Sequence, residues 1–414
     1  YPLNPGLWCG ATGGAVAVFR LTAVAVAPET AANRLRHRTE RQPAVVETSA
    51  VPGLDEHLAC FLDVGHCSCL LLWRQDASGS GFRLLNPLGD AATRSAFQPS
   101  ADDGAGMCGL EDPRLFSFLG RAWVICTCVG ASRVEGSAFS GADTERHAHH
   151  TLVFPLEPDP ERPPLLLRYP QRRTIEKNWM PFEHEGRLLL VYSLSPHTVL
   201  SVDTSTGLCT EAHATHFSPV EGSAEDTGIE ILERGEVGNG VPPVRVELPS
   251  GEAVMLGAGH IRAVPPADAP SSQCDGRVVR KTFFYAFDAS PPFRIRGVGP
   301  LRTLLHPHAG PYHEPLVEFL SGMCVRGEEM LLAYGVDDAF AHVTTWPLQR
   351  VLADVGLSSS GTREASDIAR PDFGRALHVA GKSTNKNTEA VLQCWLANDG
   401  LPPLILVAWG PLLE

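Results

Sequence analysis

The sequence predicts an all-β protein, folded as a five-bladed β-propeller with an active-site funnel along its axis. Three observations carry this prediction. The chain has 414 residues, of which 43% are apolar, enough for a large buried core. Helical periodicity is scarce, and one two-strand unit recurs five times along the chain. Closed β architectures often exceed the usual length of one domain, so this length fits a single propeller.

The recurring unit has a constant layout. A short apolar segment, in most copies opened by a polar or small residue and a proline, leads to a glycine turn. An apolar run of four to six residues follows and ends in a polar side chain. We interpret each copy as two antiparallel strands joined by a turn. The copies cover residues 4–20, 112–128, 180–197, 242–260 and 319–338.

Further strand candidates lie between and after the copies, and they bring each copy to about four strands, which is the pattern of a propeller blade. A β-sandwich or two separate all-β domains would be the alternative. The additional candidates are Ala59–Asp63, Cys69–Arg74, Thr151–Pro155, Val199–Val202, Thr282–Phe287 and Val343–Trp346.

The domain organisation follows from these units. Residues 1–350 are predicted to form the catalytic propeller, and residues 351–414 a linker and a C-terminal extension that packs on it. Leu348–Val355 suits a short helix, and residues 356–378 are rich in Ser, Gly, Arg and Asp. Residues 389–409 carry apolar segments that suit strands.

Composition excludes several classes of protein. The net charge is −13 and the pI about 5.7, which argues against a nucleic-acid or anionic-membrane partner. No apolar run approaches the roughly 18 residues needed to cross a bilayer, and we recognise no signal peptide. The 11 cysteines are expected to be buried thiols, which favours a reducing, cytoplasmic location.

The candidate acid lies in the stretch Gly109–Phe116, where Asp112 precedes Pro113. Proline suits the first residue of a strand, so we expect Asp112 at the mouth of a strand on a rigid backbone. One placed acid can protonate a leaving oxygen. Most glycosidases also need a second carboxylate, for which the candidates are Glu225, Asp226 and Glu314. A phosphate nucleophile needs no base, only a cationic cradle that aligns it.

Polar residues that open or close the repeats are predicted to converge on the axis, although they are far apart in the sequence. Arginine provides a forked contact to phosphate and lysine a point charge. We therefore expect phosphate to contact Arg20, Lys177, His197 and one of Arg133 and Arg146. The last two arginines lie beside and within the Gly/Ser/Ala-rich loop 134–147. The further candidates for contact with substrate are Asn4, Glu111, Asn178, His260 and Asp338, while Glu111 and Arg114 also hold the blade.

The motifs resemble those of one enzyme family. Glu111–Arg114, Lys177–Phe182, Gly257–His260 and Tyr334–Asp338 are similar to the blade motifs of glycoside hydrolase family 130, the five-bladed β-mannoside phosphorylases. Segments 192–197 and 283–288 look closer to glycosyltransferase family 108, the protozoan β-1,2-mannan phosphorylases and transferases. The resemblance covers about residues 1–350.

The resemblance implies an inverting β-1,2-mannan phosphorylase. Asp112 would be the general acid, which in that family can act through the O3 hydroxyl of the sugar. Arg20 and Lys177 match phosphate-site positions, and Asp338 matches a ligand of a mannose hydroxyl. The implied partners are β-mannan oligosaccharides, mannose 1-phosphate and phosphate as co-substrate, with no other cofactor. A GDP-mannose-dependent β-1,2-mannosyltransferase and a non-catalytic glycan-binding propeller are the alternatives.

Each of these residues also has a plain structural interpretation. Asp112 can cap a turn before Pro113, Lys177 can be a solvated strand end, and the two histidines can be satisfied core residues. Two tempting motifs are rejected. The tract 146–150 has no cysteine or carboxylate at ligand spacing, so no metal is predicted. Segment 380–384 lacks the first glycine of a phosphate-binding loop.

Overall fold

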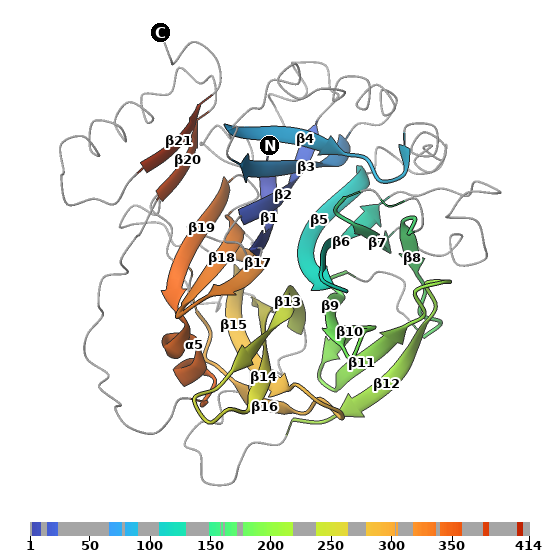
Figure 1. Ribbon diagram of the computed structural model, residues 1–414, viewed down its shortest axis with the longest axis vertical. Coiled ribbons are helices and arrows are strands. Elements are labelled where there is room, and N and C mark those ends of the chain that lie inside the picture. The colour runs from blue at the N-terminus through green and yellow to red at the C-terminus, as the bar shows by residue number, and fades with distance from the viewer. Residues whose placement is uncertain are drawn as a thin grey trace.

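The computed structural model forms a ring of antiparallel blades around a central axis (Figure 1). It describes residues 2–9, 15–23, 66–76, 79–89, 107–129, 149–157, 159, 162–171, 177–217, 237–263, 279–302, 304, 318–336, 340–357, 376–380 and 404–408. The predicted fold class, an all-β five-bladed propeller, is confirmed.

The strands follow one another blade by blade from the axis outwards. Blade one holds β1 (Pro2–Cys9), β2 (Ala15–Ala23), β3 (His66–Asp76) and β4 (Gly79–Leu85). Blade two holds β5 (Met107–Phe118), β6 (Arg121–Val129), β7 (His149–Pro155) and β8 (Leu165–Leu167). Blade three holds β9 (Met180–His184), β10 (Arg187–Leu194), β11 (His197–Val202) and β12 (Cys209–Thr215). Blade four holds β13 (Val237–Glu247), β14 (Ala253–Ala263), β15 (Val279–Asp288) and β16 (Ile295–Val298). Blade five holds β17 (Glu318–Arg326), β18 (Glu329–Val336) and β19 (Phe340–Pro347).

The ring closes through its inner strands. β1 contacts β5, β5 contacts β9, β9 contacts β13, β13 contacts β17, and β17 returns to β1. Blades one and two are also joined by a short parallel pairing of β3 with β5, so their strands form one eight-stranded sheet. The inner strands of all five blades therefore meet at the axis, as the repeat predicted.

Each blade buries both of its faces, which explains the continuous apolar runs in the second strand of each repeat. Side chains alternate between the faces of a strand. In β10, Leu188 and Leu190 pack towards blade two, while Leu189 and Val191 pack towards blade four. A run of four apolar residues in this strand thus serves two interfaces.

The core is divided accordingly into five apolar clusters, one for each interface between neighbouring blades. Each cluster draws its residues from two adjacent blades, whose order around the ring is shown in Figure 1. This arrangement buries apolar surface between sheets instead of in one central core.

The sequence located the strands nearest the axis and missed the outer ones. The five two-strand copies and the candidates matching β3, β7, β11, β15 and β19 are confirmed. β4, β8, β12 and β16 were not predicted. β12 is largely exposed and reads Cys-Thr-Glu-Ala-His-Ala-Thr, without an apolar run. The candidate Ala59–Asp63 and the predicted loop 134–147 lie outside the described residues.

The predicted helix is present as α5 (Leu348–Asp354), which buries Leu348, Val351 and Leu352 in the cluster between blades four and five. The helix therefore adds side chains to the core between these two blades. A parallel pair, β20 (Ala376–Ala380) and β21 (Leu404–Ala408), follows, and β20 contacts β19.

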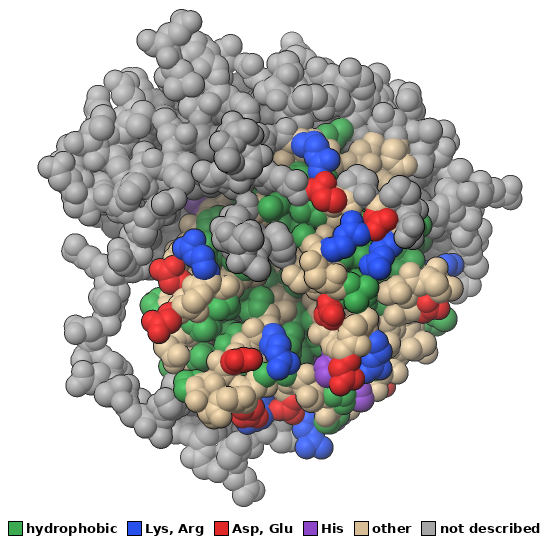
Figure 2. Space-filling model, viewed as in Figure 1, with side chains coloured by type: hydrophobic (Ala, Val, Ile, Leu, Met, Phe, Trp, Pro, Cys, Tyr) green, Lys and Arg blue, Asp and Glu red, His purple; other side chains and the backbone are tan. Residues whose placement is uncertain are grey.

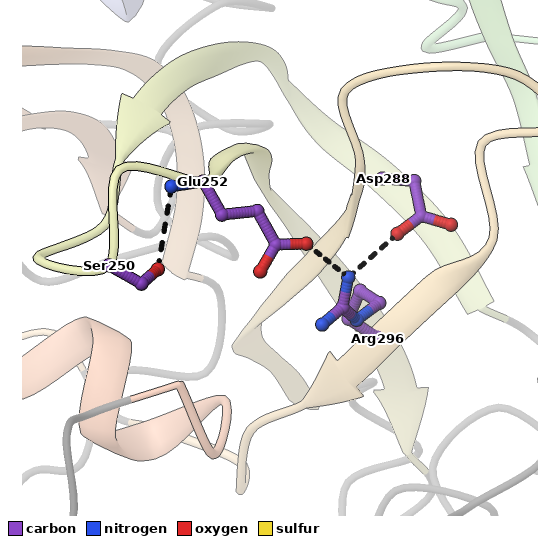
Figure 3. A network of polar contacts seen from close by, with 4 residues as sticks. All are labelled: Ser250, Glu252, Asp288 and Arg296. Atoms are coloured by element: carbon purple, nitrogen blue, oxygen red, sulfur yellow. Dashed lines mark hydrogen bonds and ion pairs between the residues drawn. The ribbon is translucent and has the colours of Figure 1, made fainter.

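The described surface carries mixed charge. In Figure 2, lysine and arginine side chains lie among aspartate and glutamate side chains on this face. Figure 3 shows one such set on blade four, where Arg296 Nη1 donates to Glu252 at 2.7 Å and to Asp288 at 3.0 Å. Within the described residues no helix is long and apolar enough to cross a membrane. The five cysteines whose side chains are described are buried thiols, as predicted.

Candidate active site

Asp112 lies at a β-bulge in the inner strand of blade two. Glu111 and Arg114 keep regular pairing with β6, so Asp112 and Pro113 together oppose the single residue Cys126. The φ angle of Asp112 is 48°, in the left-handed region that Asp and Asn tolerate better than most residues. Bulges re-aim side chains and are common beside active sites.

The predicted position of Asp112 needs one correction. It was expected at the mouth of a strand, but β5 already begins at Met107. The bulge is what accommodates Pro113, because a bulged residue does not need to donate to the ladder. Asp112 therefore has residues paired with β6 on both sides of it in the chain, and not only after it.

The same kind of distortion recurs around the ring near the start of each repeat. Register shifts occur between Leu3 and Gly6, Glu111 and Arg114, Asn239 and Val244, and Leu320 and Gly322. In blade three, β9 begins just after Asn178, whose φ is 66°. The inner strands thus leave ideal geometry at related positions around the axis.

Arg114 ties three blades together at this level. Its Nε donates to Gly240 O in blade four at 2.7 Å, and its Nη2 donates to Asn178 Oδ1, beside blade three, at 3.3 Å. Nη1 donates to the backbone carbonyls of Asp112 at 2.7 Å and Pro113 at 3.2 Å. One guanidinium therefore contacts both Asp112 and Asn178, two residues with a left-handed backbone.

Arg114 is buried and packs against an aromatic ring. The residue is 1% exposed, and its guanidinium carbon lies 4.8 Å from the centre of the Phe319 ring in blade five. Burial lowers the pKa of Arg114 to about 10, against the opposing charge of Asp112. The side chain remains protonated at neutral pH, as its hydrogen bonds require.

Glu111 and Lys177 form an ion pair between blades two and three. Lys177 Nζ lies 3.0 Å from Glu111 Oε2; the lysine side chain is 31% exposed and the glutamate 1%. Because Glu111 is almost fully buried, this cation offsets a charge that would otherwise be costly. Lys177 retains an exposed portion, and its predicted contact with phosphate stays a prediction.

A small pocket opens beside Asp112, with a cavity volume of about 10 Å³. It lies between blades two and three. Its lining residues are Asp112, Arg114, Ile125, Cys126, Thr127, Thr151, Asn178, Trp179 and Met180. The structure thus brings the predicted acid Asp112 together with the predicted sugar ligand Asn178.

Two hydroxyl-bearing residues of this pocket were not assigned to the site by the sequence analysis. Thr127 of β6 and Thr151 of β7 are paired across the strands, and each is 5% exposed. A threonine inside an apolar strand carries no distinct signal. Only the register between β6 and β7 places the two hydroxyl groups side by side.

His197 lies elsewhere, in the interface between blades three and four. Its Nδ1 is 2.8 Å from Phe293 O, and its ring packs 5.0 Å from the Phe287 ring. Nε2 is buried with no hydrogen-bond partner among the described residues. Burial lowers the pKa of His197 to about 4, against the opposing hydrogen bond to Phe293. The structure does not bring His197 into the pocket with Asp112.

Replacing His197 with Asn is expected to reduce the loss of stability in acid. With a folded-state pKa of about 4 against a usual 6.5, the neutral ring contributes fully above pH 6.5 and progressively less as the pH falls towards 4. Wild type should lose about 2.5 kcal/mol more than the variant between about pH 7.5 and 4.5. Urea unfolding at both pH values measures this. Equal losses in the two proteins would contradict it.

His260 lies nearer the axis, on β14 between Gly238 and Thr282. Its ring centre is 5.1 Å from that of Phe319, the ring that also contacts Arg114. A Cβ at Gly238 would come within 2.7 Å of the imidazole, so a glycine there leaves room for the ring. The predicted contact of His260 with sugar stays a prediction.

The remaining predicted residues cannot be placed in the site. Asn4 and Arg20 lie on β1 and β2, whose backbone pairing is described, but their side chains are outside the described set. The other candidates also lie outside it: Arg133, Arg146, Glu225, Asp226, Glu314 and Asp338.

The described groups set what the pocket can do. Asp112 supplies a carboxylate at its wall, Asn178 an amide, and the two threonines neutral hydroxyl groups that both donate and accept. Among the described residues no group of His, Cys, Asp and Glu could hold a metal ion. This arrangement suits a polar, hydroxyl-rich ligand beside one acid.

Comparisons with known proteins bear on the fold alone. No protein-family model matches the chain, and no curated protein matches its sequence. Among solved structures, a β-1,2-mannobiose phosphorylase from Listeria innocua is similar, with a TM-score of 0.44 and 13% identity over 86% of this chain and 92% of that one.

Two further solved structures are similar over comparable lengths. One is described as a glycoside hydrolase of family 130 that targets β-1,2 mannosidic linkages in Candida mannan; its TM-score is 0.43, with 14% identity over 84% of each chain. The other is MPT-1, a GDP-mannose-dependent mannosyltransferase from Leishmania mexicana, with a TM-score of 0.39 and 12% identity over 84% of this chain and 86% of that one.

Proposed function

We propose that this protein is an inverting phosphorylase of β-mannosides, with β-1,2-mannan oligosaccharides as substrates and Asp112 as the general acid. The observation that carries the proposal is the pocket between blades two and three, in which Asp112 is held at a bulge beside Asn178. The identity of the sugar and of the linkage is proposed from the resemblance of the motifs.

The distribution of carboxylates favours phosphorolysis over hydrolysis. Among the described residues, Asp112 is the one carboxylate that lines the pocket. Its neighbour Glu111 is buried and paired with Lys177, so it is unsuited to activate water. A glycosidase normally needs two carboxylates with access to substrate. A phosphate anion is already nucleophilic and removes the need for the second.

The reaction then needs one proton transfer and one displacement. A phosphate oxygen attacks C1 of the mannoside as the bond from C1 to the glycosidic oxygen breaks. Asp112 gives its proton to the leaving oxygen, directly or through a sugar hydroxyl. Inversion at C1 converts the β-mannoside into α-mannose 1-phosphate. In the reverse direction, mannose 1-phosphate donates mannose to an acceptor and returns the proton to Asp112.

The cations for phosphate are proposed to come from Arg20 and from Arg133 or Arg146, with Lys177 at the edge. Arg114 has a different task. Its donors are engaged by backbone carbonyls and Asn178, so it holds the acid in place. Positioning of this kind matters because a misplacement of about 1 Å can lower the rate about 100-fold.

The test is an incubation of the protein with mannose and a single donor, either mannose 1-phosphate or GDP-mannose, followed by sizing of the products. Chain growth from mannose 1-phosphate with release of phosphate is expected. If chains grow only with GDP-mannose, the protein is a nucleotide-sugar transferase on the same fold and not a phosphorylase. No growth with either donor, and no breakdown of β-mannobiose with phosphate, would favour a glycan-binding propeller.

A further inference from the structure

A polar row crosses blade two at the level of the acid. Glu111 on β5 pairs with Thr127 on β6, and Thr127 pairs with Thr151 on β7. Residues directly opposite each other in an antiparallel sheet point to the same face. On that face Ile125 and Val153 pack against blade three, so the row faces blade three as well.

The row has an apolar end and a charged end. Thr151 pairs in turn with Leu167, which is 1% exposed and belongs to the apolar cluster between the blades. At the axis end, Glu111 is paired with Lys177. Between them, the two threonines line the pocket that Asp112 also lines.

The threonine hydroxyl groups are available to a ligand. Within the described part of the chain neither makes a hydrogen bond, and neither is among the fully buried polar atoms that lack a partner. Their Cβ atoms are about 5 Å apart, as for any directly opposed pair. Each hydroxyl both donates and accepts, as the hydroxyl groups of a sugar do.

The charges around the row suit a neutral ligand. Lys177 is paired with Glu111, and the donors of Arg114 are engaged by carbonyl and amide oxygens. These two cations are therefore already occupied on the side of the row, so this end of the pocket is poorly suited to phosphate. We infer that Thr127 and Thr151 form a subsite that recognises hydroxyl groups of the mannoside and so determine its specificity. This inference rests on the proposed function.

The test replaces each threonine with Val, which has nearly the same shape and the same preference for strands. With β-1,2-mannobiose and phosphate, kcat/KM for the disaccharide should fall about 3- to 10-fold for Thr127→Val and for Thr151→Val, as expected for one lost hydrogen bond each. KM for phosphate should not change. Thr127→Ser and Thr151→Ser keep the hydroxyl group and should retain wild-type values.

A matched control comes from blade five. Thr344 lies on β19, is 8% exposed and is not part of the pocket, so Thr344→Val should leave all kinetic constants unchanged. Monodeoxy mannosides sharpen the test. Wild type should discriminate against the analogue that lacks the recognised hydroxyl, whereas the corresponding Val variant should bind it and the parent sugar equally well.

Binding of mannobiose measured by calorimetry without phosphate separates this inference from the proposed function. If wild type binds but does not phosphorolyse, and the Val variants bind more weakly, the subsite stands and the proposed reaction falls. If wild type phosphorolyses and the Val variants stay within about 2-fold of it, the subsite falls alone. The inference would also be overturned if the Val variants lost affinity for phosphate as much as for the disaccharide, or if wild type did not bind mannobiose at all.

Discussion

Asp112→Asn is expected to abolish phosphorolysis of β-mannobiose while leaving the protein folded and able to bind the sugar. General acid catalysis contributes about 100- to 10,000-fold, and an amide has no proton to give a leaving oxygen. Asn also tolerates the left-handed backbone that Asp112 adopts at φ 48°, so the bulge should persist. The measurement is kcat in both directions of the reaction, together with calorimetric binding of mannobiose.

The leaving group provides an independent check on this role. A nitrophenolate departs without needing a proton, so nitrophenyl β-mannoside should lose much less activity than mannobiose when Asp112 becomes Asn. An equal loss with both substrates would mean that Asp112 acts otherwise than as an acid. Loss of folding would return it to a structural role before Pro113.

Asp288→Asn is the matched control. Asp288 lies at the end of β15 and contacts Arg296 on the surface of blade four, far along the chain from the pocket residues (Figure 3). The substitution makes the same chemical change outside the pocket, so kcat should stay within about 2-fold of wild type. A surface ion pair contributes about 1 kcal/mol or less to stability, so the fold should be kept as well.

The sequence was sufficient for the first three strands of each blade, and its clearest signal is the second strand of each repeat, which buries both faces. The run from Leu188 to Val191 is a visible signal for that reason. Outer strands bury less, and β12 alternates without an apolar run, so pattern alone could not find it.

The site was predictable only in part. Asp112 and Asn178 could be found because each stands beside a proline-containing motif in a repeat. Thr127 and Thr151 could not, because their proximity depends on the register of β6 and β7. The core position of His197 depends on Phe293, which is 96 residues away in the chain. No pattern within one blade reports a contact of that kind.

Arg114→Met is expected to cause the largest loss of stability of any single substitution considered for this site. Arg114 is 1% exposed and donates to carbonyl oxygens of Gly240, Asp112 and Pro113 and to Asn178 Oδ1. Methionine fills a similar volume but leaves these acceptors without a donor. Each unsatisfied buried acceptor costs about 1–3 kcal/mol, so a loss of about 3–5 kcal/mol is expected in urea unfolding.

Arg114→Lys separates charge from geometry. Lysine keeps the positive charge but offers one donor centre, which cannot reach blade four, Asn178 and the Asp112 carbonyl together. It should lose somewhat less stability than Met, and yet kcat should fall about 100-fold because Asp112 and Asn178 are no longer held in register. The effect on kcat should exceed the effect on KM. A Lys variant with normal kcat would show that the forked geometry is not needed.

Arg296→Met is the control for removing a guanidinium as such. Arg296 also has two carboxylate partners, Glu252 and Asp288, but its side chain is 38% exposed. Solvent replaces these contacts, so the expected loss is about 1 kcal/mol or less with no change in kcat. Arg114 is buried near the axis, whereas Arg296 lies on the surface of blade four. Comparing the two variants tests whether the stability of the propeller depends on the buried arginine that links three blades beside Asp112. Similar losses for both would place the stabilisation in the blade interfaces instead.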